Sequence, residues 1–70
     1  MAVDIDLLKM KIAEKGLTGE AISDILSIDQ STYYRKLKHN GKDFTVEQVY
    51  KLKGALALSG DDAIRIFFKQ

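Results

Sequence analysis

The sequence predicts a single all-α domain built from five short helices. Three observations predict it: apolar residues recur at helical spacing, N-cap residues and glycines interrupt the chain at short intervals, and no stretch alternates long enough for a strand. The chain has 70 residues, of which 46% are hydrophobic and 30% charged. This length allows one compact core and this composition is typical of a globular domain, so we expect one domain over residues 1–70.

The first two helices are predicted from apolar spacing and from the residues that flank them. Apolar side chains at i, i+3 and i+7 predict a helix over residues 5–15, followed by Gly16 as a left-handed terminator. Thr18 is the predicted N-cap of a second helix of about eight residues. Leu17 and Ile22 stand at the two positions of a hydrophobic staple around that cap.

Two further N-cap signatures predict the third and fourth helices. Asp29 as an N-cap starts a helix over residues 30–38, and residues 39–43 then form a polar loop. Thr45 and Gln48 have the spacing of a capping box, so the fourth helix is predicted to begin directly after Thr45.

The last helix follows Ser59 and ends in two adjacent aromatic residues. Ser59 and Asp62 form its N-terminal signature. Phe67 and Phe68 lie about 100° apart on a helix, so only one of them can point to a given spot in the core. The other is left for a partner, which motivates the hypothesis of a homodimer.

Composition excludes several classes of function. The chain contains no cysteine and one histidine, His39, so thiolate metal sites, multi-histidine metal sites and a serine–histidine–aspartate triad are not expected. We predict that the protein is not an enzyme and that it needs no cofactor, metal or small-molecule effector. No apolar run approaches the roughly 20 residues of a membrane span, and Asp4 and Asp6 are atypical of a signal peptide, so we expect a cytoplasmic protein without a membrane partner.

Charge is distributed unevenly along a chain whose net charge is only +1. Residues 30–42 contain Arg35, Lys36, Lys38 and Lys42 and no acid, which makes this segment +4; the other seven basic and ten acidic residues sum to −3. A local basic patch on a nearly neutral protein indicates a site for a polyanion at one face.

Residues 18–38 have the spacing of a helix-turn-helix. Such a unit needs a small fifth residue where the helices cross and a tight turn near the ninth position. Counted from Gly19, these positions are Ser23 and Ser27. The predicted inner faces are formed by Ile22, Leu26, Tyr33 and Leu37.

A helical projection of residues 30–38 separates a buried from an exposed face. Tyr33 and Leu37 set the buried direction, and Ser31 and Arg35 point away from it. Cations and hydrogen-bonding side chains on an exposed helix suit the DNA major groove, where arginine pairs with guanine and glutamine with adenine. The predicted base-reading residues are Gln30, Ser31 and Arg35; the predicted phosphate contacts are Thr32, Lys36, Lys38, Lys42 and the backbone amides of Asn40 and Gly41. Tyr34 either packs at the edge or places its hydroxyl on a phosphate.

Several short motifs, in this order and spacing, resemble the phage repressor family of Cro/CI-type helix-turn-helix proteins. They are Leu17-Thr18-Gly19-Glu20, the segment STYYRKL at 31–37, NGK at 40–42 and Phe44-Thr45 opening a helix, and the likeness spans roughly residues 7–68. The resemblance implies a five-helix domain of the lambda-repressor type that binds operator DNA, usually as a dimer, and represses transcription in a bacterial or phage-infected cell. It also implies base contacts at Asp29, Gln30, Ser31 and Arg35, and phosphate contacts at Gly19, Thr32 and the loop around Lys42.

Three positions differ from the family pattern, and each carries a structural expectation. Gly19 replaces a glutamine, which leaves only the backbone amide for a phosphate. Ser27 replaces a common glycine and is expected to cost about 1 kcal/mol if the turn needs a positive φ. Asp29 places an acid beside the groove, where it either caps the helix or accepts a hydrogen bond from cytosine.

A second function remains open from the sequence. The aromatic end at Phe67 and Phe68 is compatible with a small helical protein-interaction module, of the antitoxin or anti-repressor kind, that uses an exposed apolar patch.

Overall fold

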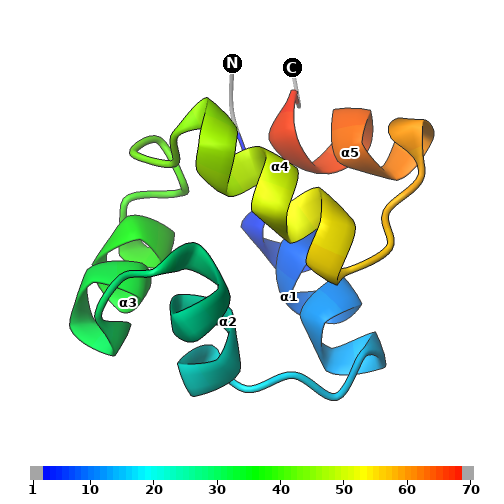
Figure 1. Ribbon diagram of the computed structural model, residues 1–70. Helices are drawn as coiled ribbons and strands as arrows, with labels where there is room; N and C mark the ends of the chain where they lie inside the picture. Colours follow the sequence, from blue (N-terminus) through cyan, green and yellow to red (C-terminus); the bar gives the residue numbers. More distant parts are fainter. Residues whose placement is uncertain (1–2, 69–70) are drawn as a thin grey trace.

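The structure is a computed structural model that describes residues 3–68. This part of the chain consists of five α-helices and their connections. No strand occurs within this range, so the predicted all-α class and the number of helices are confirmed (Figure 1). None of these helices combines the length and the apolar character that crossing a membrane requires. The helices are α1 (Ile5–Glu14), α2 (Gly19–Leu26), α3 (Gln30–Lys38), α4 (Val46–Ala55) and α5 (Gly60–Phe67).

Side-chain caps explain why most helices begin where they do. The hydroxyl of Thr18 accepts a hydrogen bond from the amide of Ala21, and Ser59 Oγ accepts one from the amide of Asp62. Thr45 and Gln48 form the predicted capping box, with both reciprocal bonds present at 3.0 and 3.1 Å. Each of these bonds satisfies a backbone donor that has no partner within its helix.

The five helices share one core. Each helix is too short to be stable alone, so its stability depends on packing against the others. α2 packs against α3 and α4, and α1 packs against α5 (Figure 1). The side chains at the centre are almost without solvent contact, and the buried apolar residues are Leu8, Ile12, Ile22, Leu26, Tyr33, Leu52, Leu56, Leu58, Ala63, Ile66 and Phe67.

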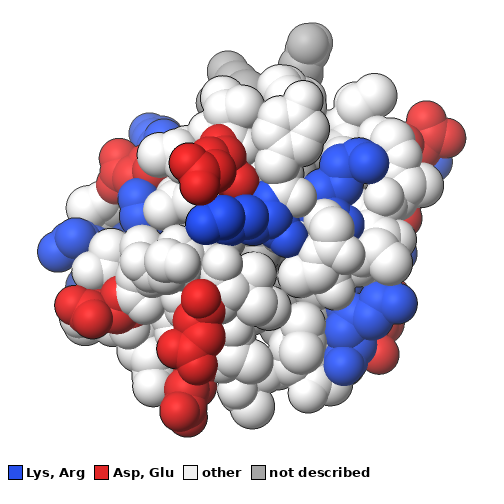
Figure 2. Space-filling model, in the orientation of Figure 1, with Lys and Arg blue, Asp and Glu red and all other residues white. Residues whose placement is uncertain are grey.

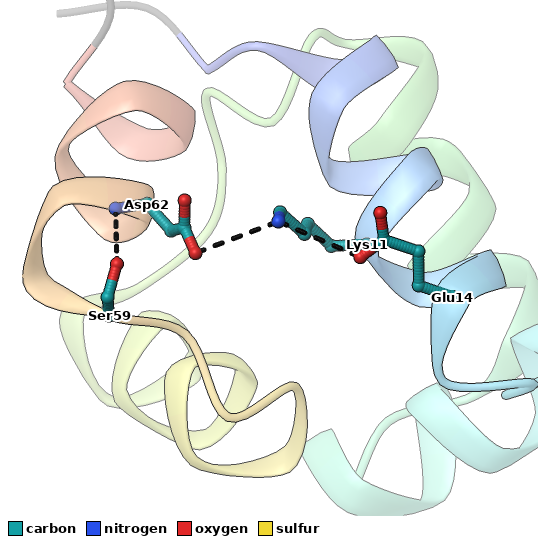
Figure 3. A network of polar contacts seen from close by, with 4 residues as sticks. All are labelled: Lys11, Glu14, Ser59 and Asp62. Atoms are coloured by element: carbon teal, nitrogen blue, oxygen red, sulfur yellow. Dashed lines mark hydrogen bonds and ion pairs between the residues drawn. The ribbon is translucent and has the colours of Figure 1, made fainter.

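Polar contacts join the first and last helices. Lys11 Nζ lies 3.7 Å from Glu14 on its own helix and 3.7 Å from Asp62 on α5, and the amide of Asp62 donates to Ser59 Oγ (Figure 3). The amide of Asp4 also donates to the carbonyl oxygen of Ile66 at 2.6 Å. Partly exposed ion pairs of this kind contribute only about 0–1 kcal/mol each, so the buried apolar side chains dominate stability.

Candidate nucleic-acid interface

The turn between α2 and α3 brings these two helices into close contact. Ser23 is 1% exposed at the crossing, and its hydroxyl donates to the carbonyl oxygen of Glu20 at 2.9 Å, so the small fifth residue is satisfied without a partner from α3. Ser27 has φ 59° and ψ 42°, which confirms that the turn needs a left-handed residue. The amides of Ser27 and Ile28 donate to the carbonyls of Asp24 and Ser23, the pattern that ends many helices at a left-handed residue.

The side of α3 that faces the core is fixed by one aromatic residue. Tyr33 is 3% exposed, and Leu37 is half-buried and packs against the same core. Burial raises the pKa of the Tyr33 phenol above its ordinary value of 10.0, with a smaller contribution in the same direction from Tyr34. The predicted buried face of α3 is therefore confirmed.

The opposite side of α3 is open to solvent. Gln30, Ser31 and Arg35 are all exposed, as is Lys38 at the end of the helix. Within residues 3–68, none of the side chains of these four residues makes a hydrogen bond or an ion pair. Their polar groups thus face solvent without a partner in the described part of the chain, and a ligand would not have to displace one.

Tyr34 and Gly19 lie against each other where α3 meets the start of α2. A Cβ atom added to Gly19 would come within 2.7 Å of Tyr34 Cζ, closer than real Cβ contacts. The side chain of Tyr34 is nevertheless 52% exposed, and its ring centroid is 5.3 Å from that of Tyr33. The phenol therefore packs at the edge of α3 and reaches the first turn of α2, and its contact with a phosphate stays a prediction.

Asp29 occupies the N-cap position of α3 but does not cap it. Its backbone is extended, with φ −70° and ψ 152°, and α3 begins at Gln30 as predicted. The expected side-chain hydrogen bond is absent, which corrects one of the two roles considered for Asp29. Its exposed carboxylate remains available to an external hydrogen-bond donor at the N-terminus of α3.

The loop after α3 corrects part of the predicted phosphate contacts. The amide of Asn40 donates to the carbonyl of Leu37 at 3.0 Å, and the amide of Gly41 donates to that of Lys36 at 2.8 Å. Gly41 is also buried, and a Cβ atom added to it would lie 2.9 Å from the Cβ atom of Val3. Both amides are thus engaged within the chain and are removed from the expected phosphate donors.

The two lysines of this region also differ from each other. Lys36 Nζ donates one hydrogen bond to the carbonyl oxygen of Asp43 at 2.7 Å, so this half-buried lysine supports the loop. His39 Nδ1 lies 3.1 Å from a carboxylate oxygen of the same aspartate. Lys42 is exposed and has no ion-pair partner among residues 3–68.

Acidic side chains border the basic surface, which the charge count along the sequence did not show. Glu20 and Asp24 are exposed on α2, and Figure 2 shows acidic side chains in a stripe over this helix, with both acidic and basic side chains toward the edge over α3. Asp24, Asp29 and Thr32 line one polar hollow at the turn between the helices. Thr32 thus lies in an acidic neighbourhood, whereas Tyr34 and Lys38 lie on the other flank of α3.

A second surface, the α4–α5 groove, lies between the last two helices. It has a volume of about 360 Å³, and its lining is mainly apolar: Val3, Phe44, Val46, Val49, Tyr50 and Phe68 are among its residues, and Lys53 is the only charged residue that lines it within residues 3–68. Phe67 is 1% exposed and Phe68 51% exposed, so the prediction that only one of the two enters the core is confirmed.

Comparison of the chain with protein-family models, with curated proteins and with solved structures gives no match in any of the three. What the protein does is therefore inferred from its own residues and their geometry.

Proposed function

We propose that this protein binds double-stranded DNA sequence-specifically and acts as a small transcriptional regulator, a repressor of the Cro/CI kind. In this proposal the five helices form a lambda-repressor-like domain and residues 18–38 form its helix-turn-helix. The observation that carries the proposal is the two-sided character of α3: Tyr33 holds one side in the core, while Gln30, Ser31 and Arg35 are exposed and without intramolecular partners on the other.

Base reading is assigned to the first two turns of α3 in the major groove. The guanidinium of Arg35 can donate two hydrogen bonds to guanine, and the amide of Gln30 can pair with adenine in the same bidentate manner. Ser31 adds a shorter donor and acceptor between them. The uncapped carboxylate of Asp29 is suited to accept a hydrogen bond from a cytosine amino group, and it would repel a phosphate.

Phosphate contacts are assigned to groups around this helix. Lys38 and Lys42 supply exposed positive charges near the end of α3, and Lys36 keeps two donors beyond the one it gives to Asp43. At the start of α2, the Gly19 amide and the Tyr34 hydroxyl are assigned as donors to one phosphate on the side of α3 that carries Tyr34. Such contacts orient the protein on the duplex without reading its sequence.

Titration of the protein with DNA over a range of salt concentrations tests the proposal directly. Fluorescence anisotropy with a labelled duplex of random sequence should give an affinity that falls steeply with salt, because cations on phosphates release counterions. Selection of bound sequences from a random duplex library should then yield one preferred site. Salt-independent binding, or a selected pool that stays random, would contradict the proposed function.

A matched control keeps the salt experiment specific to α3. Lys9 is an exposed lysine on α1, outside the α2–α3 unit, and Lys9→Ala removes the same charge as Lys38→Ala. We expect Lys38→Ala to lower the affinity for DNA and Lys9→Ala to leave it within about twofold of the unmodified protein. Equal losses in the two variants would mean that binding follows net charge and does not use this surface.

The α4–α5 groove favours one alternative, a small protein-interaction module of the antitoxin or anti-repressor kind. Its apolar lining and the exposed Phe68 are suited to an apolar partner, whose binding would change little with salt. The salt titration therefore also distinguishes the two functions.

A further inference from the structure

The α4–α5 groove has only two polar side chains in its lining within residues 3–68. They are the hydroxyl of Tyr50 and the ammonium group of Lys53. The two residues stand at i and i+3 on α4, and residues with this spacing are neighbours on one face of a helix. The polar side chains of the groove are therefore concentrated on one wall, and the other side chains that line it are apolar.

Neither of these two groups has a partner in the part of the chain that the structure describes. The half-buried Lys53 side chain makes no ion pair and no hydrogen bond there, and the Tyr50 hydroxyl makes no hydrogen bond. By contrast, Lys51 on the same helix lies 3.3 Å from Glu47. Because apolar side chains partly screen the Lys53 charge from water, an anion beside it is bound more strongly than at an open surface.

The apolar walls of the groove come from segments that are far apart in the chain. Val3 precedes α1, Phe44 and Val46 lie at the start of α4, and Phe68 follows α5 (Figure 1). Val46 and Phe68 are 74% and 51% exposed, so a ligand reaches them without a rearrangement. The volume of about 360 Å³ is at the lower end of the range for small-molecule sites, which are typically apolar and aromatic with a few polar groups. Local sequence patterns did not predict this site, since its walls meet only in the folded chain.

We propose that the α4–α5 groove binds a small amphipathic carboxylate, a molecule of the fatty-acid class. Its carboxylate accepts hydrogen bonds from the ammonium group of Lys53 and from the hydroxyl of Tyr50. Its apolar chain lies along Phe44, Val46 and Phe68 and removes their exposed surface from water.

The scarcity of polar groups favours this ligand over an extended segment of another protein. A polypeptide carries an amide and a carbonyl group at almost every residue, and each of them needs a hydrogen-bond partner where it is buried. Among the side chains of the groove, only Tyr50 and Lys53 offer one. The chain of a fatty acid has no polar group beyond its head, and two donors on one wall suffice for that head. The positive charge of Lys53 selects an anionic head.

Titrations with three probes that share one apolar chain test the choice of head group. Decanoate, decanol and decylammonium differ only in the head, which is negative, neutral or positive. Two-dimensional NMR of the isotope-labelled 7.9 kDa protein follows each titration below the concentration at which the probe forms micelles. Decanoate should give saturable shifts at the amides of Val49, Tyr50 and Phe68, which line the groove. Decylammonium should bind about tenfold more weakly, because Lys53 repels it.

Substitutions on α4 separate the head of the ligand from its chain. Lys53→Gln should weaken decanoate about tenfold and leave decanol within about twofold, since only the charged head depends on the ammonium group. Tyr50→Phe removes one hydrogen bond and should weaken decanoate about threefold. Lys51→Gln is the matched control, because it removes a charge from the same helix outside the groove, and it should change neither affinity. Circular dichroism verifies that the variants are folded.

Three results would overturn the ligand site. They are decanoate shifts that do not saturate or that lie on α3, decylammonium binding as tightly as decanoate, and a Lys53→Gln variant that binds decanoate as tightly as the unmodified protein. Because no DNA is present, a failure here leaves the proposed function standing, and loss of DNA binding leaves the ligand site standing.

Discussion

The phenol of Tyr34 occupies the space in which a side chain at position 19 would lie. Only a glycine leaves room for it, since a Cβ on Gly19 would lie 2.7 Å from Tyr34 Cζ. Any larger residue at position 19 would displace the ring. Tyr34 thus brings its hydroxyl to the start of α2. The packing of Tyr34 therefore depends on the absence of a side chain at Gly19.

Gly19→Ala and Tyr34→Phe are expected to weaken DNA binding through the same contact. Tyr34→Phe removes only the hydroxyl and should weaken binding about three- to tenfold on all sequences, since a hydrogen bond contributes about 1 kcal/mol. Gly19→Ala should cause a similar loss by displacing the ring, and the double variant should be no weaker than either one. Anisotropy titrations of the three variants measure this coupling.

Gly54→Ala is the control for that pair. Nothing lies within 4 Å of a Cβ at Gly54 on α4, so alanine should only stabilise the helix, by about 1 kcal/mol, and leave DNA affinity unchanged. Additive losses for Gly19→Ala and Tyr34→Phe would show that the two residues do not share a contact.

Arg35→Ala and Lys42→Ala should separate base reading from phosphate binding. Loss of the guanidinium should cost about 1–3 kcal/mol on the preferred site and relax the preference at one base pair. Loss of Lys42 should weaken binding to all sequences alike and reduce the salt slope by about 1. Parallel titrations on the selected and a scrambled duplex check both, and equal losses on the two duplexes for Arg35→Ala would refute its assigned role.

Ser27→Gly should stabilise the protein. Ser27 adopts φ 59°, which costs a residue with a Cβ about 1–2 kcal/mol, whereas the greater freedom of glycine in the unfolded chain offsets part of that gain. We expect a net increase of about 0.5–1 kcal/mol in the free energy of unfolding, measured by urea denaturation. Ser59→Ala, which removes the cap of α5, should lower it by about 1 kcal/mol. A destabilising Ser27→Gly would show that the serine side chain itself holds the turn.

The raised pKa of Tyr33 predicts that the protein loses stability in alkaline solution. Its pKa is raised in the folded state because burial disfavours the phenolate, so the folded state retains this proton more strongly than the unfolded state. The resulting stability is fully present below the unfolded pKa of 10.0 and is lost as the pH rises through the higher folded value. Urea midpoints measured on either side of pH 10 should fall less for Tyr33→Phe than for the unmodified protein.

A midpoint of Tyr33→Phe that falls as steeply as that of the unmodified protein would assign the alkaline transition to other groups. The comparison is made within each protein, because the substitution also changes packing in the core.

Local residue patterns were sufficient to predict most of the secondary structure. Thr18, Thr45 and Ser59 each supply a side-chain oxygen to a nearby amide, so the starts of their helices depend on neighbours within three residues. Asp29 has the same local signature, and its helix begins where predicted, yet its side chain makes no cap bond. A preference for a position does not determine which rotamer the side chain adopts there.

The candidate DNA-binding surface was predicted less completely. The exposed face of α3 follows from helical periodicity alone, because Tyr33 sets the buried direction. Helical periodicity does not predict that the Gly41 amide donates to the carbonyl oxygen of Lys36, or that Gly41 is buried against Val3. The second of these contacts joins residues far apart in the chain, which no local pattern reports.

By itself, the sequence determined the five helices, the buried side of α3 and the basic character of the segment that contains it. These properties depend on side chains a few residues apart along a regular backbone. Only the tertiary structure decided that Tyr34 reaches Gly19, that acidic side chains of α2 border the basic surface, and that α4 and α5 together form an apolar groove. The reason is physical: each of these features is a distance between separate helices, and such distances are set when all the apolar faces pack into one core.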